Sequence, residues 1–265
     1  MPGLHVVVTG SGTPAVLVHG SFSFGALAFS EQGPLAAEFE LHVVDRRGFG
    51  RSPDGSGPVD FETEAPEIAA LLDPPAHLLG LSYGAIICMF AAALRPEAVR
   101  SLTVIEPPAF GLVRGDPAVD LLVERLRAHK RDGAGLAEED YLRGFLDAWG
   151  FDLGPGPRLN DTARRSVRRS VGERSPHEAE IPFAELVAAS FPTLVVHGGW
   201  DAVPERARAI GGHAFTAVCD VVAARLDAEV AAFSGAAHQP QLLGEPFNRR
   251  VAEFWHAADR RFAGT

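Results

Sequence analysis

The chain has 265 residues, and its 24 Lys and Arg against 34 Asp and Glu give a formal net charge of −10. This acidic balance argues against nucleic acid or an anionic membrane surface as a partner. The two cysteines, Cys88 and Cys219, have neither metal-ligand spacing nor a disulfide framework. We find no secretory signal and no apolar stretch long enough to span a bilayer. We expect a cytoplasmic monomer or homodimer that acts on a small molecule.

Short apolar runs alternate with helical patterns along the chain, which is typical of a mostly parallel sheet covered by helices on both faces. The sequence therefore predicts an α/β fold. The predicted strands are Leu4–Thr9, Ala15–Val18, Leu41–Asp45, His77–Leu81, Ser101–Ile105, Thr193–His197 and Glu229–Phe233. The predicted core helices are Pro34–Phe39, Glu62–Leu72, Tyr83–Leu94, Pro204–Leu226 and Glu245–Phe262.

The first turn, Gly10 to Ala15, has the spacing of a dinucleotide-binding G-x-G-x-x-A motif. That motif requires a helix to begin at its end, so that the helix N-terminus meets the pyrophosphate. Here another apolar strand pattern follows. We therefore interpret the segment as a turn between two strands.

Residues 107–190 break the alternation, because they contain helical patterns and no convincing strand. The patterns are Pro117–His129, Glu138–Trp149, Thr162–Val171 and Phe183–Ala189. We interpret this segment as a helical insertion at the C-terminal edge of the sheet, between core parts 1–106 and 191–265. The basic run 164–169 is interpreted as a solvated helix face rather than an anion site.

Gly80-Leu81-Ser82-Tyr83-Gly84 lies between a predicted strand and a predicted helix. A strand that turns directly into a helix lifts the residue at the joint out of the sheet, above the helix N-terminus. Side chains two positions before and after the joint would collide with the strand and the helix, which explains the two glycines. The sequence thus predicts Ser82 as a nucleophile.

A serine hydroxyl needs a neighbouring base, and the base needs an orienting acid. His238 is the predicted base, because it lies in a loop of small residues after the last strand. Asp201 is the predicted acid, since it follows a strand and a glycine turn, although it could instead cap a helix. Glu106, which also ends a strand, is the alternative acid.

An oxyanion hole requires two backbone N–H groups near the nucleophile. We expect one from Tyr83 and one from Ser21, in the loop after the second strand, with Phe22 as the fallback. His19 precedes this loop and is expected to brace it. Aromatic side chains are expected to line the substrate pocket: Phe22, Phe24 and Trp200.

Together these motifs resemble the α/β-hydrolase fold superfamily over essentially the whole chain, in the family order of nucleophile, acid and histidine. The resemblance implies a helical cap at residues 107–190 and a structural role for the loop Asp45–Ser52. Serine at position 82 argues against haloalkane dehalogenases and epoxide hydrolases, which carry Asp there. The motifs are His19-Gly20, Asp45–Ser52, Gly80–Gly84, Gly198–Asp201 and Gly235–His238.

The predicted reaction is hydrolysis of a carboxylic ester or lactone of a small to medium, fairly apolar substrate, through an acyl-enzyme on Ser82. It requires no metal or organic cofactor. The same residues would serve a carbon–carbon bond hydrolase or a cofactor-free perhydrolase of haloperoxidase type. A third hypothesis is a receptor-like protein that binds a ligand and has weak turnover.

Overall fold

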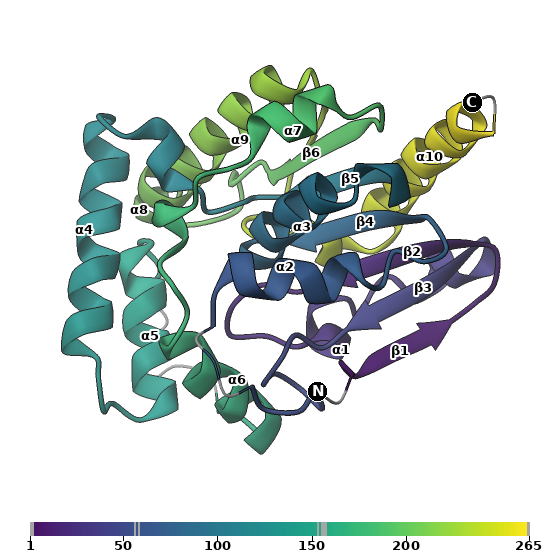
Figure 1. Cartoon of the computed structure of the whole chain (residues 1–265). Helices are drawn as coiled ribbons and strands as arrows, with labels where there is room; N and C mark the ends of the chain where they lie inside the picture. The colour runs from purple at the N-terminus through teal and green to yellow at the C-terminus, as the bar shows by residue number, and fades with distance from the viewer. Residues whose placement is uncertain (1–2, 56, 58, 153, 155–157, 264–265) are drawn as a thin grey trace.

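The computed structural model describes residues 3–55, 57, 59–152, 154 and 158–263. A seven-stranded sheet in the order β1-β3-β2-β4-β5-β6-β7 forms the centre of the molecule, and all its neighbouring strands are parallel except β1 and β3 (Figure 1). The predicted α/β fold with a mostly parallel sheet is confirmed. The strands are β1 (Val6–Thr9), β2 (Thr13–Val18), β3 (Phe39–Val44), β4 (Ala76–Leu81), β5 (Val99–Ile105), β6 (Thr193–Gly198) and β7 (Glu229–Phe233).

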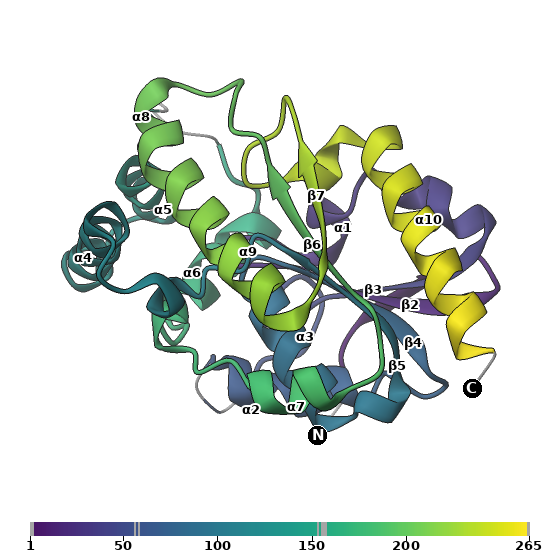
Figure 2. The same ribbon diagram turned by 90° about the horizontal axis from the view of Figure 1, so that it is seen from above.

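Helices cover both faces of the sheet: α1 and α10 lie on one face, and α2, α3, α7 and α9 on the other (Figure 2). Successive strand residues point to opposite faces. In β4, Leu78 packs into the cluster with α3, whereas Leu79 packs into the cluster with α10. The α-helices are α1 (Gly25–Ala28), α2 (Phe61–Ala69), α3 (Tyr83–Leu94), α4 (Pro117–Asp132), α5 (Glu138–Ala148), α6 (Asp161–Val171), α7 (Phe183–Ala188), α8 (Glu205–Ala207), α9 (His213–Leu226) and α10 (Glu245–Phe262). Short 3₁₀ turns lie at Gly33–Ala37, Pro96–Ala98, Phe110–Val113, Pro176–Glu178 and Pro240–Leu243, and a π-helical turn at Arg208–Gly212.

The insertion between β5 and β6 forms a helical cap beyond the carboxyl ends of the parallel strands (Figure 1). Side chains cap its helices where the sequence changes from loop to helix: Asp116 accepts from two amides of α4, and Asn160 accepts from Ala163 of α6. Helix α7 also belongs to the insertion by sequence, but it packs against α3 and α9 on a face of the sheet. We therefore call α4, α5 and α6 with their connections the cap.

The basic run 164–169 on α6 fastens the cap to the core. Arg165 donates to the carbonyl oxygens of Gly50 and Ser52, at 2.7 and 2.8 Å. Two others pair with carboxylates of α5: Arg164 with Glu139 (2.6 Å) and Arg168 with Glu138 (2.7 Å). The side chains of Arg164, Arg165 and Arg168 are 44%, 31% and 59% exposed, in agreement with the predicted solvated face. What the sequence does not show is that Arg165 also ties the cap to the core.

The helical run Glu205–Leu226 is long and apolar enough to cross a membrane by length and composition, which the sequence analysis did not recognise. In this fold its α9 part packs against β6. Phe215, Val218 and Val222 are fully buried there in the core cluster. A helix buried in a protein core satisfies the same criteria of length and hydropathy as a membrane-spanning helix.

The packing of α10 predicts a large loss of stability for Trp255→Ala. The fully buried Trp255 ring lies 4.9 Å from the Phe39 ring and 5.1 Å from the His77 ring. The cavity left by the indole should lower the free energy of unfolding by about 3–5 kcal/mol. Arg249→Ala, at an exposed position of the same helix, should change it by less than about 0.5 kcal/mol. Denaturant titrations measure both, and equal losses would contradict the packing argument.

Candidate active site

Ser82 occupies the junction between β4 and α3 with φ 55° and ψ −123°, a strained conformation for a residue with a side chain. Its amide donates to the carbonyl oxygen of Ile105 at 2.8 Å, which ties the turn to β5. A Cβ at Gly80 or Gly84 would lie 2.5 or 2.3 Å from backbone atoms. The two glycines are therefore sterically required, as the sequence motif predicts.

The predicted base, His238, is held by a buried glutamate. His238 Nδ1 lies 2.7 Å from Glu106 Oε2, and the Glu106 side chain has no exposed surface. The other oxygen, Oε1, accepts from the amide of Gly198 and from Trp200 Nε1, both at 2.8 Å. Three donors thus fix this carboxylate against the imidazole, as an orienting acid requires.

Asp201, the first choice as acid, is not at this position. Its side chain is exposed and accepts hydrogen bonds from the Ser234 hydroxyl and, at 2.7 Å, from the Gly235 amide. These bonds lower the pKa of its carboxyl. Asp201 therefore stabilises the turn that leads to His238, and the alternative, Glu106, occupies the position of the acid.

Two aromatic rings, which also contact each other, pack against the His238 imidazole. The Trp149 ring, at the end of α5, lies edge-on at 4.7 Å, and the Phe215 ring of α9 lies at 4.3 Å. Only 14% of the His238 side chain is exposed. The cap and the core therefore shield the base from water together.

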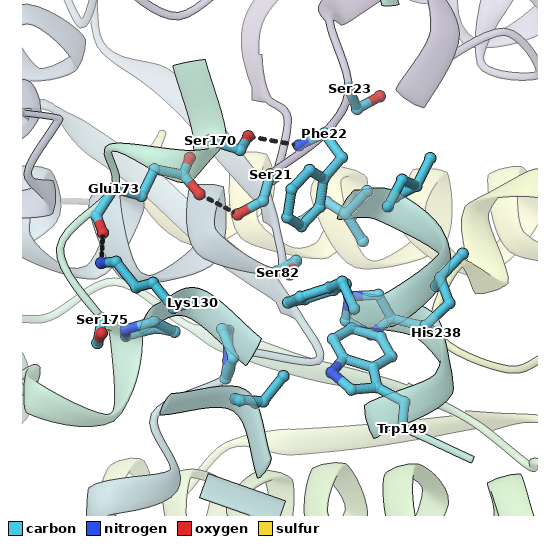
Figure 3. Close-up of a pocket in the computed structure, with 18 of the residues that line it drawn as sticks. Ser21, Phe22, Ser23, Ser82, Lys130, Trp149, Ser170, Glu173, Ser175 and His238 are labelled. Atoms are coloured by element: carbon cyan, nitrogen blue, oxygen red, sulfur yellow. Dashed lines mark hydrogen bonds between the residues drawn. The ribbon is translucent and has the colours of Figure 1, made fainter. Parts of the chain in front are cut away.

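Ser82 and His238 line one pocket of about 350 Å³ between the cap and the core (Figure 3). Of the three aromatic residues expected there, Phe22 lines the pocket. Phe24 does not, and Trp200 is buried beneath it as a partner of Glu106. Most of the wall is apolar, including from the cap Leu126, Tyr141, Leu142, Phe145, Leu146 and Trp149. A polar end carries Lys130, Ser170, Glu173 and Arg174.

The loop of residues 19–22, which we call the oxyanion loop, lies directly against the nucleophile. A Cβ at Gly20 would lie 2.8 Å from Ser82 Cβ. Tyr83 begins α3, so its amide has no acceptor within the helix. The Phe22 amide donates to Ser170 Oγ at 2.7 Å and is thereby occupied, which favours Ser21 over the fallback as the donor from the loop.

His19 braces this loop. Its Nε2 accepts from the amide of Arg46 at 3.0 Å, so Nδ1 carries the proton and donates to the Gly20 carbonyl at 2.7 Å. Because that carbonyl shares a peptide plane with the Ser21 amide, the bond also orients the amide. Burial and the neighbouring Arg46 charge lower the pKa of His19 to about 3, so the ring stays neutral. The expected bracing contact is present.

No local pattern in the sequence points to Trp149, Ser170 or Glu173 as site residues. They are 67 to 91 positions from Ser82 in the chain, and they lie at or just beyond the ends of α5 and α6, whose docking no local pattern reveals. Glu106 did carry a signal, a carboxylate directly after a buried strand and before Pro107-Pro108.

Residues 13–202 match the family model described as alpha/beta hydrolase fold. A pimeloyl-[acyl-carrier protein] methyl ester esterase from Methylococcus capsulatus is 32% identical over 190 residues, 69% of this chain and 70% of that protein. An esterase of the same name from Aeromonas hydrophila is 38% identical over 104 residues, only 38% of this chain and 41% of that protein. A solved thermophilic esterase from Thermogutta terrifontis has a TM-score of 0.65 at 22% identity, covering 96% and 93% of the two chains. This structural likeness shows the fold.

The contacts of His238 predict that Glu106→Gln is far more damaging than Asp201→Asn. An amide at position 106 cannot stabilise the imidazolium, and such a change in a triad lowers kcat by about 10⁴-fold. Asp201→Asn keeps an acceptor in an exposed turn and should lower kcat by less than about tenfold. Steady-state kinetics on an activated ester compare the two. The opposite ranking would return the role of acid to Asp201.

The buried neutral His19 predicts a pH-dependent stability. Its pKa falls from 6.5 to about 3 on folding, so the unfolded chain binds the proton more readily. The contribution of the neutral His19 ring to the free energy of unfolding is fully present above about pH 6.5. It decreases toward pH 3, by up to about 1.4 kcal/mol per pH unit. His19→Asn should have a lower free energy of unfolding than the unmodified chain at pH 7. Between pH 6 and pH 4.5, however, its free energy of unfolding should decrease less. Parallel curves from denaturant titrations would contradict this assignment.

Proposed function

The chain belongs to the α/β-hydrolase family, and we propose that it is a serine esterase for a carboxylic ester or lactone of a small to medium, fairly apolar substrate. The observation that carries this proposal is the hydrogen bond between His238 and the buried Glu106, in the pocket that Ser82 also lines. The two relatives described above are named as methyl ester esterases, which supports an ester as the bond that is cleaved.

In the first half of the reaction, Ser82 Oγ attacks the ester carbonyl carbon while its proton passes to His238 Nε2. The imidazolium keeps its Nδ1–H bond to Glu106, whose negative charge stabilises it. The carbonyl oxygen becomes an oxyanion that accepts from the Ser21 and Tyr83 amides. The carbon–oxygen bond to the alcohol then breaks, and the alcohol leaves with the proton from His238.

In the second half, water attacks the acyl group on Ser82 and gives a proton to His238. The second tetrahedral intermediate releases the carboxylic acid, and the proton returns to Ser82 Oγ. The sum is one ester and one water converted to an acid and an alcohol, so the cycle closes without a cofactor.

The pocket supports a substrate of moderate size. A volume of about 350 Å³ lies at the lower end of the range for small-molecule sites. Its apolar wall from the cap would bury hydrocarbon, and the polar end near Glu173 lies in the same cavity. The acyl chain or alcohol is therefore expected to be largely apolar.

A cytoplasmic location remains our prediction. It is supported by the two cysteines, which are buried free thiols of raised pKa rather than a disulfide. A monomer or homodimer, without nucleic-acid or membrane partners, also remains a prediction.

The test is intact-protein mass spectrometry after brief exposure to a fluorophosphonate, with ester hydrolysis measured in parallel. The unmodified chain should gain one adduct, and Ser82→Ala should gain none and lose kcat on the order of 10⁶-fold. The control is Ser175→Ala, a serine of the same pocket, which should react as the unmodified chain does. Tight ligand binding without adduct or turnover would favour a receptor-like protein instead.

A substrate panel separates the reactions that share this site. Activated esters and lactones should be hydrolysed fastest. Dienone cleavage or peracid formation from acetate and peroxide at a greater kcat/KM would reassign the chain to carbon–carbon hydrolysis or perhydrolysis.

A further inference from the structure

Two cap side chains form hydrogen bonds with the oxyanion loop, one at the C-terminal end of α6 and one just beyond it. Ser170 Oγ accepts from the Phe22 amide at 2.7 Å, and Ser21 Oγ donates to Glu173 Oε2 at 2.5 Å (Figure 3). Phe22 has φ 58°, which is unfavourable for a bulky residue. Such a conformation persists only where neighbouring groups fix it. The two bonds therefore act on the strained part of the loop.

Glu173 is held firmly from the core. Its Oε1 lies 2.9 Å from Arg46 Nη1, and the Arg46 side chain has no exposed surface. Arg46 also binds both oxygens of Glu64, each at 2.9 Å. The backbone of Glu173 forms a β-bridge with Val59. Because the Glu173 carboxylate is held by these contacts, it stays in place and determines where the Ser21 hydroxyl lies.

Two sets of hydrogen bonds, one from the core and one from the cap, hold the backbone on either side of the Ser21 amide. On the core side, His19 holds the Gly20 carbonyl, and the Arg46 amide holds His19. On the cap side, Glu173 accepts from the Ser21 hydroxyl, and Ser170 accepts from the Phe22 amide. Arg46 takes part in both sets of contacts: its amide donates to His19, and its guanidinium pairs with Glu173.

Building on the esterase function proposed above, we propose that Ser170 and Glu173 are positioning residues that hold the Ser21 amide in its catalytic orientation. The oxyanion hole is then complete only while the cap is seated on the core. These residues act through Ser21 and Phe22 and do not touch the reacting atoms. Their loss should lower kcat and leave KM nearly unchanged, because the apolar wall that binds substrate belongs largely to α4 and α5.

The first experiment compares Ser170→Ala with Ser166→Ala. Both serines lie on α6, but the Ser170 hydroxyl bonds to the Phe22 amide, whereas the Ser166 hydroxyl donates to the Thr162 carbonyl within the helix, away from the pocket. Removing an oxyanion donor costs 10²–10³-fold in kcat, so loosening one should cost about tenfold. We expect this roughly tenfold loss of kcat in Ser170→Ala, with KM changed by less than about twofold, and no loss of kcat in Ser166→Ala.

A pair of ligands reports on the oxyanion hole itself. Ser82 Oγ adds to the carbonyl carbon of an aryl trifluoromethyl ketone while its proton passes to His238, and the carbonyl oxygen becomes an oxyanion in the hole. The matching alcohol binds without reaction. In Ser170→Ala the ketone should lose affinity by the same factor as kcat, and the alcohol should bind as before. A purely structural role would change the melting temperature without separating the two ligands.

Glu173 is tested by a double-mutant cycle with Ser21, since Ser21→Ala keeps the backbone amide and removes only the hydroxyl. Glu173→Gln and Ser21→Ala should each lower kcat, and the double variant should be no slower than the slower single variant. If Glu173→Gln does not fold, Ser170→Ala and its ligand pair still decide the question.

The outcomes separate this inference from the proposed function. An active enzyme in which Ser170→Ala has the same kcat as Ser166→Ala, or in which the losses of the Ser21 and Glu173 variants add, would overturn the inference alone. Equal loss of affinity for ketone and alcohol would also overturn it, because it would indicate a change of pocket shape. Absence of turnover and of a Ser82 adduct in the unmodified chain would overturn the esterase function, and the inference with it.

Discussion

The positive charge of Arg46 has no access to water, and the structure around it balances that charge. Glu64 from α2 and Glu173 from the cap pair with the guanidinium, and the rings of Phe49 and Tyr83 lie 4.5 and 4.6 Å from it. Removing one partner of a buried ion pair costs about 3–5 kcal/mol, because the remaining charge is left uncompensated. The cap is thus tied to the core by an interaction that is costly to break and lies next to the nucleophile.

Backbone strain concentrates at the same place. Among the described non-glycine residues with positive φ, four belong to the site or its immediate support: Phe22, Ser82, Glu106 and Trp200. The fifth, Asp227, ends α9. Each such conformation costs about 1–3 kcal/mol and persists only because surrounding contacts fix it. Ser82 and Glu106 directly follow β4 and β5, and Trp200 comes two residues after β6. Trp200 donates to Glu106, and Glu106 in turn orients His238.

Much of the fold could be predicted from the sequence, because burial on both faces makes parallel strands continuous apolar runs and amphipathic helices keep a regular period. The α10 bounds agree with the prediction, and the α3 bounds do as well. The acid could not be chosen in this way, since Asp201 and Glu106 both follow strands. What distinguishes them is tertiary: Trp200 Nε1 and the Gly198 amide bind Glu106 in the interior, while Asp201 stays at the surface.

The cap helices contribute to catalysis in different ways. Tyr141, Phe145 and Trp149, from α5 and its end, supply an apolar wall, and Trp149 shields the imidazole of the base. Excluding water there strengthens every charge interaction of the triad. The end of α6 instead supplies polar bonds to the loop that carries Ser21. The two contributions meet at Phe22, whose amide donates to Ser170 and whose ring lies 4.5 Å from the Phe145 ring. A change of the apolar wall at Phe145 would therefore also act on the loop that carries the oxyanion donor.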